Sequence, residues 1–131
     1  MRHQADVLIG IHIRRGDYRV WRDGMYFFDD ASYASWMQQL EEVFLTRGQK
    51  VIFYLASDEA INEAKFKTFK IYKGQPSKMV DLYTLAQCDY LLGPPSTFSL
   101  WAAFIGHGQL LHVEDSNQRL KLESFKYYES R

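Results

Sequence analysis

The sequence predicts an α/β fold: a Rossmann-like parallel sheet of about five strands with helices on both faces. Three observations predict it. Short apolar runs rich in β-branched and aromatic residues recur along the chain and are typical of buried strands. Segments with apolar residues at helical spacing separate these runs. Strands and helices alternate, which is the order that lays parallel strands side by side.

The expected strands are short, and polar or glycine-containing residues follow each of them. The first reads Ala-Asp-Val-Leu-Ile-Gly-Ile-His-Ile and the second Val-Ile-Phe-Tyr-Leu-Ala. Continuous apolar runs of this kind indicate strands that are covered on both faces of the sheet. We expect strands at residues 5–13, 51–56, 68–72, 89–92 and 109–113.

Four helices are expected between these strands. In the first, apolar side chains recur at helical spacing up to Phe44, with Asp30 or Ser32 as the cap and Gly48 at the left-handed end. The other three are expected at about residues 59–66, 78–87 and 97–105. The last 18 residues are polar with scattered aromatic side chains, and their pattern predicts no element.

The composition fits one domain that spans residues 1–131 and has a core, since 47% of the residues are hydrophobic. Sixteen basic residues balance sixteen acidic ones, so no overall attraction to nucleic acid is expected. No apolar run reaches the roughly 20 residues of a membrane span. The single cysteine, Cys88, and the lack of a signal-like run favour a cytoplasmic protein. Peripheral attachment to a membrane is left open.

The residues that follow the strands are the candidates for a site, because ligands of such folds lie outside the carboxyl ends of the strands. The first strand is followed by Arg14 and Arg15. Alternation along a strand places His12 and Arg14 on one face and Arg15 on the other. Guanidinium groups suit phosphate oxygens, so a local anion site is expected. The same residues also fit a loop with solvated arginines and a turn at Gly16.

Two acidic residues have both a functional and a structural interpretation. Asp58 follows the second strand in Ser57-Asp58-Glu59, where it contacts a ribose or base, or else belongs to the first turn of a helix. Asp81 lies early in a helix, where a carboxylate either suits the helix dipole or accepts hydrogen bonds from a guanine.

Ser96 and Thr97 open a helix behind Gly93-Pro94-Pro95. Backbone N–H groups and hydroxyls at a helix N-terminus make an anion site, although an ordinary serine cap explains Ser96 equally well. The histidines show no metal-ligand spacing, and the sequence lacks GxxxxGK[ST], GxGxxG, GxSxG and DxD motifs. We expect no metal site and no cofactor.

Three segments together resemble the fucosyltransferase superfamily with the HxRRxD motif. The first, residues 12–18, reads His-Ile-Arg-Arg-Gly-Asp-Tyr. The second is Ser57-Asp58-Glu59, and the third runs from Asp81 to the Ser-Thr-Phe-Ser-Leu-Trp-Ala-Ala of residues 96–103. The motifs occur in family order over about residues 5–110 and are most similar to bacterial α-1,2-fucosyltransferase-like proteins of glycosyltransferase family 11.

The resemblance implies the donor-binding C-terminal half of a GT-B enzyme that inverts configuration, uses GDP-fucose and requires no metal. Arg14 then grips the donor β-phosphate and acts in catalysis, His12 contacts the nucleoside, and Asp81 reads guanine. Arg15 and Asp17 shape the loop, and Ser96 or Thr97 binds phosphate. The expected substrate-binding residues are His12, Arg14, Arg15, Asp17, Asp58, Asp81, Ser96 and Thr97.

In such enzymes an N-terminal domain supplies most of the site for the glycan acceptor. The abrupt start at Met1 suggests that this domain is missing here, so the chain alone is expected to bind GDP without transferring a sugar. Two alternatives remain open at this point. One is a transferase for another sugar nucleotide or for pyruvate on the same fold, and the other is a non-catalytic module that binds a nucleotide or a protein partner.

Overall fold

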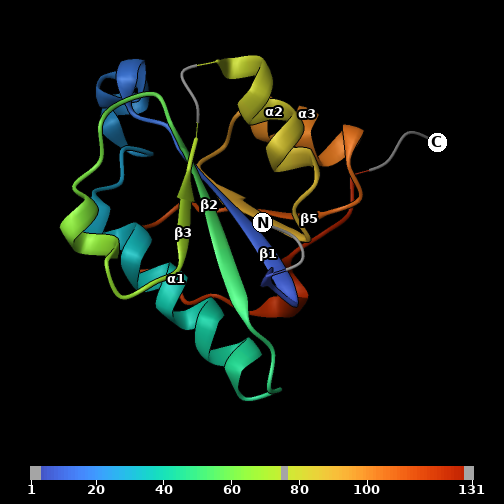
Figure 1. Ribbon diagram of the computed structural model, residues 1–131. Coiled ribbons are helices and arrows are strands. Elements are labelled where there is room, and N and C mark those ends of the chain that lie inside the picture. The colour runs from blue at the N-terminus through green and yellow to red at the C-terminus, as the bar shows by residue number, and fades with distance from the viewer. Residues whose placement is uncertain (1–3, 75–76, 129–131) are drawn as a thin grey trace.

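A computed structural model describes residues 4–74 and 77–128, without the side chains of Asp17, Arg19 and Asp23. It confirms the α/β class. Five parallel strands form one sheet in the order β3-β2-β1-β4-β5 (Figure 1). The strands are β1 (Val7–Ile13), β2 (Val51–Ser57), β3 (Ile71–Lys73), β4 (Tyr90–Gly93) and β5 (Gln109–His112).

Three α-helices cover the two faces of this sheet (Figure 1). They are α1 (Asp30–Leu45), α2 (Lys78–Ala86) and α3 (Thr97–Ile105). Helix α1 packs on one face, and α2 and α3 pack together on the other. Four turns of 3-10 helix lie at Gly16–Arg19, Trp21–Gly24, Glu63–Phe66 and Leu122–Ser124. The chain therefore has the three-layer arrangement that the alternating pattern predicts.

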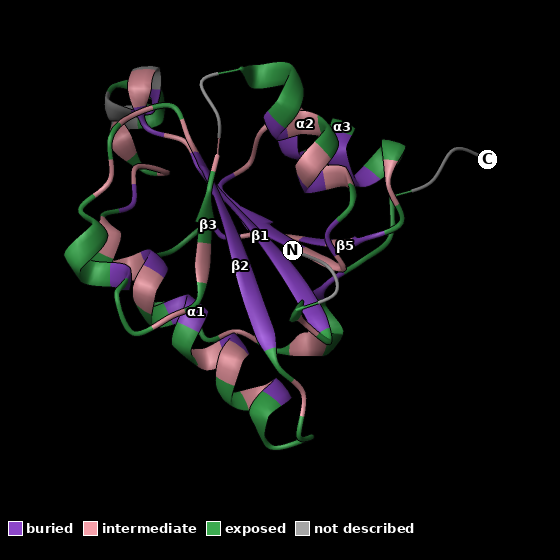
Figure 2. Cartoon of the chain, in the orientation of Figure 1, coloured by how far each residue is buried: buried purple, intermediate pink, exposed green. Residues whose placement is uncertain are grey.

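The sheet is buried between its helices, and β1 and β2 are buried almost along their whole length (Figure 2). Residues of β1 alternate between the two cores, as strand geometry requires. Ile9, Ile11 and Ile13 face α1, whereas Leu8 packs with the cluster beneath α2 and α3. Helix α1 contributes Tyr33, Trp36, Met37, Leu40 and Phe44 to its core.

The prediction of a helix at residues 59–66 was wrong. Only Glu63–Phe66 is helical, as one 3-10 turn, and the side chain of Asn62 caps it by accepting the N–H of Ala64. Before it, the Ser57 hydroxyl donates to the carbonyl of Glu59. A serine that bonds its own neighbouring backbone competes with helix formation, which explains why the acidic residues there do not start a helix.

Two other expectations differ in detail. The cap of α1 is Asp29 rather than Asp30 or Ser32, because its carboxylate accepts the N–H of Ser32. Strand β3 lies at Ile71–Lys73 and not at residues 68–72, since its register is set by pairing with Phe53 to Leu55 of β2. Gly48 has a positive φ of 70°, as its predicted place after α1 requires.

The C-terminal segment, for which the sequence predicted no element, belongs to the fold. Phe125 is buried in the core beneath α1, and Lys126 forms an antiparallel bridge with Leu110 of β5. The indole N–H of Trp36 donates to the carbonyl of Gln118 at 3.0 Å. Within the described ranges, no helix is both long and apolar enough to cross a bilayer.

Candidate nucleotide-binding site

The candidate site lies where the order of the strands reverses. Strand β1 pairs with β2 on one side and with β4 on the other, and the chain proceeds outward in both directions. In open α/β sheets this switch point is where ligands bind, outside the carboxyl ends of the strands. A pocket of about 70 Å³ lies there. It is lined by His12, Arg14, Ala56, Ser57, Asp58, Lys78, Asp81 and Phe98.

Arg14 follows directly on β1 and provides the guanidinium of this pocket. Its Nε lies 3.9 Å from Oδ2 of Asp58, and its Cζ lies 5.4 Å from the centre of the Tyr18 ring. A carboxylate on one side and an aromatic face on the other orient a guanidinium. Arg14 is thus held at the edge of the sheet, where the sequence predicts an anion-binding group.

Asp58 also anchors the loop that carries Arg14. Its Oδ1 accepts the backbone N–H of Arg15 at 2.9 Å. A Cβ at Gly16 would lie 2.7 Å from Oδ2 of the same carboxylate, so any larger residue at position 16 would displace the carboxylate of Asp58. The predicted contact of Asp58 with a ribose or base stays a prediction. Its carboxylate links the segment of residues 57–59 to the segment of residues 12–18.

Arg15 does not line this pocket. It lies on the α1 side of the sheet, 6% exposed, as the alternation along β1 predicts. Its guanidinium pairs with Asp30 and donates through Nε to the carbonyl of Phe28 at 3.1 Å. These contacts fit the role in shaping the loop that the resemblance implies for Arg15, and its place among the substrate-binding residues stays a prediction.

His12 is buried beside Arg14. Its Nδ1 lies 2.9 Å from the hydroxyl oxygen of Ser99, and its ring lies against Phe98, with centroids 4.9 Å apart. Burial, followed by the positive charge of Arg14 and the proximity of His112, lowers the pKa of His12 to about 4. The imidazole is therefore neutral near neutral pH, with one nitrogen carrying a proton and the other accepting.

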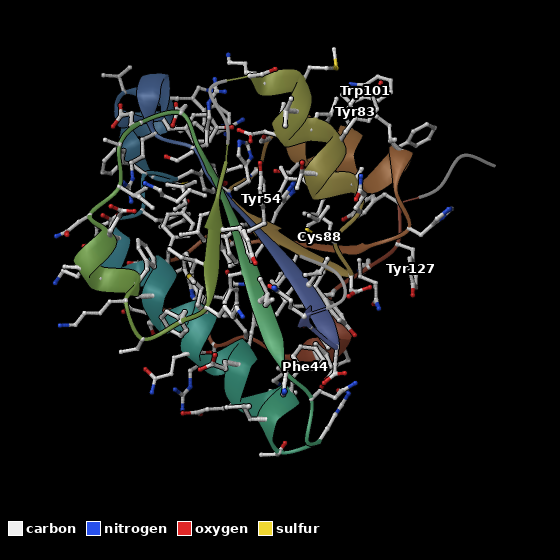
Figure 3. The ribbon with its side chains drawn as sticks, viewed as in Figure 1. Phe44, Tyr54, Tyr83, Cys88, Trp101 and Tyr127 are labelled. Atoms are coloured by element: carbon white, nitrogen blue, oxygen red, sulfur yellow. The ribbon has the colours of Figure 1, made fainter. Side chains whose placement is uncertain are left out.

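Asp81 reaches the pocket from the first turn of α2. Its Oδ1 accepts the hydroxyl proton of Tyr54 at 2.6 Å, and Tyr54 belongs to β2, in the sheet beneath α2 (Figure 3). Because the side chain is largely buried, its contacts lie inside the site rather than in solvent. The position fits both interpretations of Asp81, the dipole of α2 and the recognition of a base.

The hydroxyls at the start of α3 do not line the pocket. Ser96 caps the helix, because its Oγ accepts the N–H groups of Phe98 and Ser99. Thr97 faces an apolar groove of about 420 Å³ that is also lined by Trp101 of α3. Figure 3 shows where Trp101 lies on this helix. The expected contact of Ser96 or Thr97 with a phosphate stays a prediction. The side chain of Asp17 lies outside the described residues.

Lys78, Phe98 and Ser99 belong to the site although the sequence did not single them out as site residues. Lys78 begins α2, directly after the capping Ser77, and brings a second cation to the pocket. Phe98 and Ser99 follow the hydroxyls that the motif emphasises. No local pattern in the sequence marked them, because their contacts with His12 depend on how α3 packs against β1.

A doubly wound parallel sheet with a pocket at its switch point defines the class of α/β domains that bind ligands outside the carboxyl ends of their strands. Residues 2–127 match the sequence model of the family described as glycosyl transferase family 11, so the chain belongs to this family.

Individual relatives agree with this assignment. The chain is 28% identical over 125 residues to galactoside alpha-(1,2)-fucosyltransferase 2 of Pongo pygmaeus. It is 26% identical over 129 residues to galactoside 2-alpha-L-fucosyltransferase Sec1 of Mus musculus. These alignments cover 84% and 88% of this chain but 34% and 33% of the relatives. The chain thus spans about a third of the length of the curated relatives it matches.

Among the side chains that the structure describes, no group of three or more His, Cys, Asp or Glu residues is placed to hold a metal ion. The cationic groups of the pocket are those of Arg14 and Lys78. Independence from metal ions stays a prediction.

Proposed function

We propose that this chain is the donor-binding domain of an inverting, metal-independent fucosyltransferase that uses GDP-fucose. One observation carries the proposal: His12, Arg14 and Asp81, which the resemblance assigns to nucleoside, β-phosphate and guanine, line one pocket at the switch point. Membership of glycosyltransferase family 11 supports the same reading. The names of the matched relatives support fucose as the sugar that is transferred.

In the proposed reaction Arg14 stabilises the leaving group. An acceptor hydroxyl attacks C1 of the fucosyl ring, the bond from C1 to the β-phosphate oxygen breaks, and configuration at C1 inverts. The electron pair goes to the diphosphate, and the hydroxyl proton goes to a base. A guanidinium held by Asp58 and Tyr18 is already oriented toward the charge that develops, which is the condition for electrostatic catalysis.

The guanosine would be read by Asp81 and His12. A carboxylate has two oxygens with about four lone-pair sites, so Asp81 can accept from Tyr54 and from the N1–H and amino group of guanine. The pocket of about 70 Å³ holds only part of a nucleotide sugar, since sites for whole ligands of this size are several-fold larger. A neighbouring pocket of about 320 Å³ shares Ser57 with it and offers room along the edge of β2.

The binding site for the acceptor and the catalytic base are proposed to come from polypeptide outside this chain. The chain spans about a third of the length of its relatives, and the described pocket contains no histidine besides His12, whose lowered pKa makes it a poor base. We also propose that the acceptor is a galactoside, as the names of the relatives indicate.

Binding of GDP to the Arg14→Ala variant tests the proposal. A hydrogen bond to a charged group contributes about 1.5–3 kcal/mol, so titration calorimetry should show roughly ten- to hundredfold weaker binding, with an unchanged circular dichroism spectrum. Arg47→Ala is the matched control, because Arg47 lies after α1 at the opposite edge of the sheet, beside the start of β1. Equal affinity of the Arg14→Ala and wild-type chains would refute the role of Arg14.

Selectivity among nucleotides tests guanine recognition separately. A ligand at 100 times its Kd adds about 2.7 kcal/mol to the free energy of unfolding, so GDP should raise the Tm more than UDP, CMP or ADP at equal concentration. Asp81→Asn should lower the preference for GDP, because an amide cannot accept two hydrogen bonds from guanine with the same geometry. A larger shift with UDP would reassign the donor, and no shift with any nucleotide would favour a non-catalytic module.

A further inference from the structure

Three elements meet around the ring of His12, and one supplies a hydroxyl to which the proposed function gives no role. Ser99 lies in the first turn of α3 and is 2% exposed. Its Oγ lies 2.9 Å from Nδ1 of His12, although 87 positions separate the two residues in the sequence. Phe98 covers one face of the imidazole. The ring is therefore fixed both at an edge and on a face.

Gly93, the last residue of β4, makes this arrangement possible. A Cβ at this position would lie 2.8 Å from the carbonyl oxygen of His12, 3.1 Å from its Cβ and 3.5 Å from Oγ of Ser99. Any side chain would therefore push β1 away from β4, whereas its distance to Oγ of Ser99 in α3 would be an ordinary van der Waals contact. The hydrogen bond between Ser99 and His12 is thus supported by a third element.

The direction of this hydrogen bond follows from the other contacts of Ser99. If Nδ1–H donated to Oγ, the hydroxyl proton would need a second acceptor. The usual one is the carbonyl four residues earlier in the helix, which is that of Pro95, but no hydrogen bond from Oγ to that carbonyl is found among the described residues. For the part of the chain that the structure describes, Nδ1 is the one hydrogen-bond partner of Oγ. Because a buried donor without a partner is unfavourable, the hydroxyl donates to Nδ1.

We propose that Ser99 is a positioning residue that keeps the proton of His12 on Nε2, so that the imidazole presents an N–H donor to an oxygen of the bound nucleotide beside Arg14. The hydrogen bond at one ring nitrogen decides which tautomer a neutral histidine adopts. The ligand in this inference rests on the proposed function, but the tautomer does not. The titratable groups near the ring are those of Arg14, Asp58, Lys78, Asp81 and His112.

The tautomer can be measured on the free chain. Long-range ¹H–¹⁵N NMR correlations on ¹⁵N-labelled protein distinguish the Nε2–H form from the Nδ1–H form, and His12→Gln identifies the signals. We expect the Nε2–H form at pH about 7. Observation of the Nδ1–H form as the main species would overturn the inference without any nucleotide being added.

Two substitutions at Ser99 then separate positioning from packing. Ser99→Ala removes the donor, so His12 should become a mixture of tautomers, its pKa should rise because the neutral form loses a hydrogen bond, and GDP should bind about tenfold more weakly. Ser99→Thr keeps the hydroxyl and should retain the tautomer and the affinity. A role in packing alone would leave the tautomer and the titration of His12 unchanged in Ser99→Ala, which contradicts the proposal.

The two levels of the proposal fail in different ways. If His12 shows the expected tautomer and loses it in Ser99→Ala, while GDP does not bind even to the wild-type chain, the proposed function fails and the positioning role stands. In a His12→Gln background the side-chain amide retains a donor near the place of Nε2 but offers no Nδ1. Ser99→Ala should there change GDP affinity less than twofold, and a tenfold loss would overturn the inference.

Discussion

At the scale of single residues, His12 is a base that the fold keeps neutral. Its ring is buried between β1 and α3, and the neighbouring guanidinium of Arg14 further disfavours a positive charge. In the folded chain His12 therefore gains its second proton as the pH falls through about 4, whereas in the unfolded chain it does so near the ordinary pKa of 6.5. Folding and protonation of this side chain oppose one another.

The free energy of unfolding should consequently fall as the pH is lowered from 6.5 toward 4. In this window the unfolded state binds more protons, so stability rises with pH. The part due to His12 is on the order of 3 kcal/mol over the whole window, of which about 2 kcal/mol is lost between pH about 7 and about 5. Urea unfolding at about pH 7 and about pH 5, compared between the wild type and His12→Gln, measures it. Parallel pH dependences of the two proteins would show that His12 is not the group responsible.

The neighbouring arginines show how far sequence reasoning reaches at this scale. Alternation along a strand was enough to send Arg14 and Arg15 to opposite faces, and the structure confirms it. The partners of Arg15 could not be predicted, because Phe28 and Asp30 lie beyond a loop whose path depends on tertiary packing. Ser99 was missed for the same reason, since its partner is 87 positions away.

At the scale of elements, the start of α1 depends on one exposed carboxylate. Asp29 accepts the N–H of Ser32 at 2.8 Å, and this hydrogen bond is the main reason why the pKa of Asp29 lies below its ordinary value of 3.8. The same helix end holds Asp30, the partner of Arg15. A firm N-terminus of α1 thus also supports the loop that leads away from the candidate site.

Asp29→Ala should lower the free energy of unfolding by about 1 kcal/mol, because an N-cap is lost. Asp29→Asn, which can also cap, should cost only a few tenths of a kcal/mol. Since the folded pKa of Asp29 is depressed, the stabilisation is complete above pH about 4 and is lost as the pH falls further. Urea unfolding of the three proteins at neutral and acidic pH would test this. A deficit in Asp29→Ala that does not shrink in acid would speak against it.

Elements were predictable where periodicity was long, as in α1, or where a cap and a glycine bracketed the helix, as in α3. The segment at residues 59–66 had acidic residues that suit a helix start but too few apolar positions to bury. There the local bond of Ser57 to Glu59 prevailed. The candidate pocket followed from knowing that strands end together at one edge, whereas the groups that α2 and α3 add to it required the actual helix orientations.

At the scale of the whole molecule, the C-terminal segment completes the core. Phe125 is 3% exposed and packs edge-on against Tyr90, with ring centroids 5.3 Å apart. Tyr127, two residues later, is 60% exposed and lies at the periphery of the molecule (Figure 3). The two aromatic side chains therefore make a matched pair for measuring what this segment contributes.

Phe125→Ala should lower the free energy of unfolding by about 3 kcal/mol, as expected when a buried aromatic ring is removed. Tyr127→Ala should change it by less than about 0.5 kcal/mol, as is usual for surface substitutions. Urea unfolding followed by tryptophan fluorescence would report both. Similar losses in the two variants would mean that the segment acts through its surface contacts and not through the core.

The bridge between Leu110 and Lys126 also covers part of the free edge of the sheet. Strand β5 lies at one rim of the sheet, and the returning backbone occupies hydrogen-bonding groups that another chain could otherwise use. Uncovered rims of this kind are templates for strand addition between molecules. A chain trimmed before Lys126 should therefore form fibrils or oligomers more readily than the intact one, even under conditions in which both are folded.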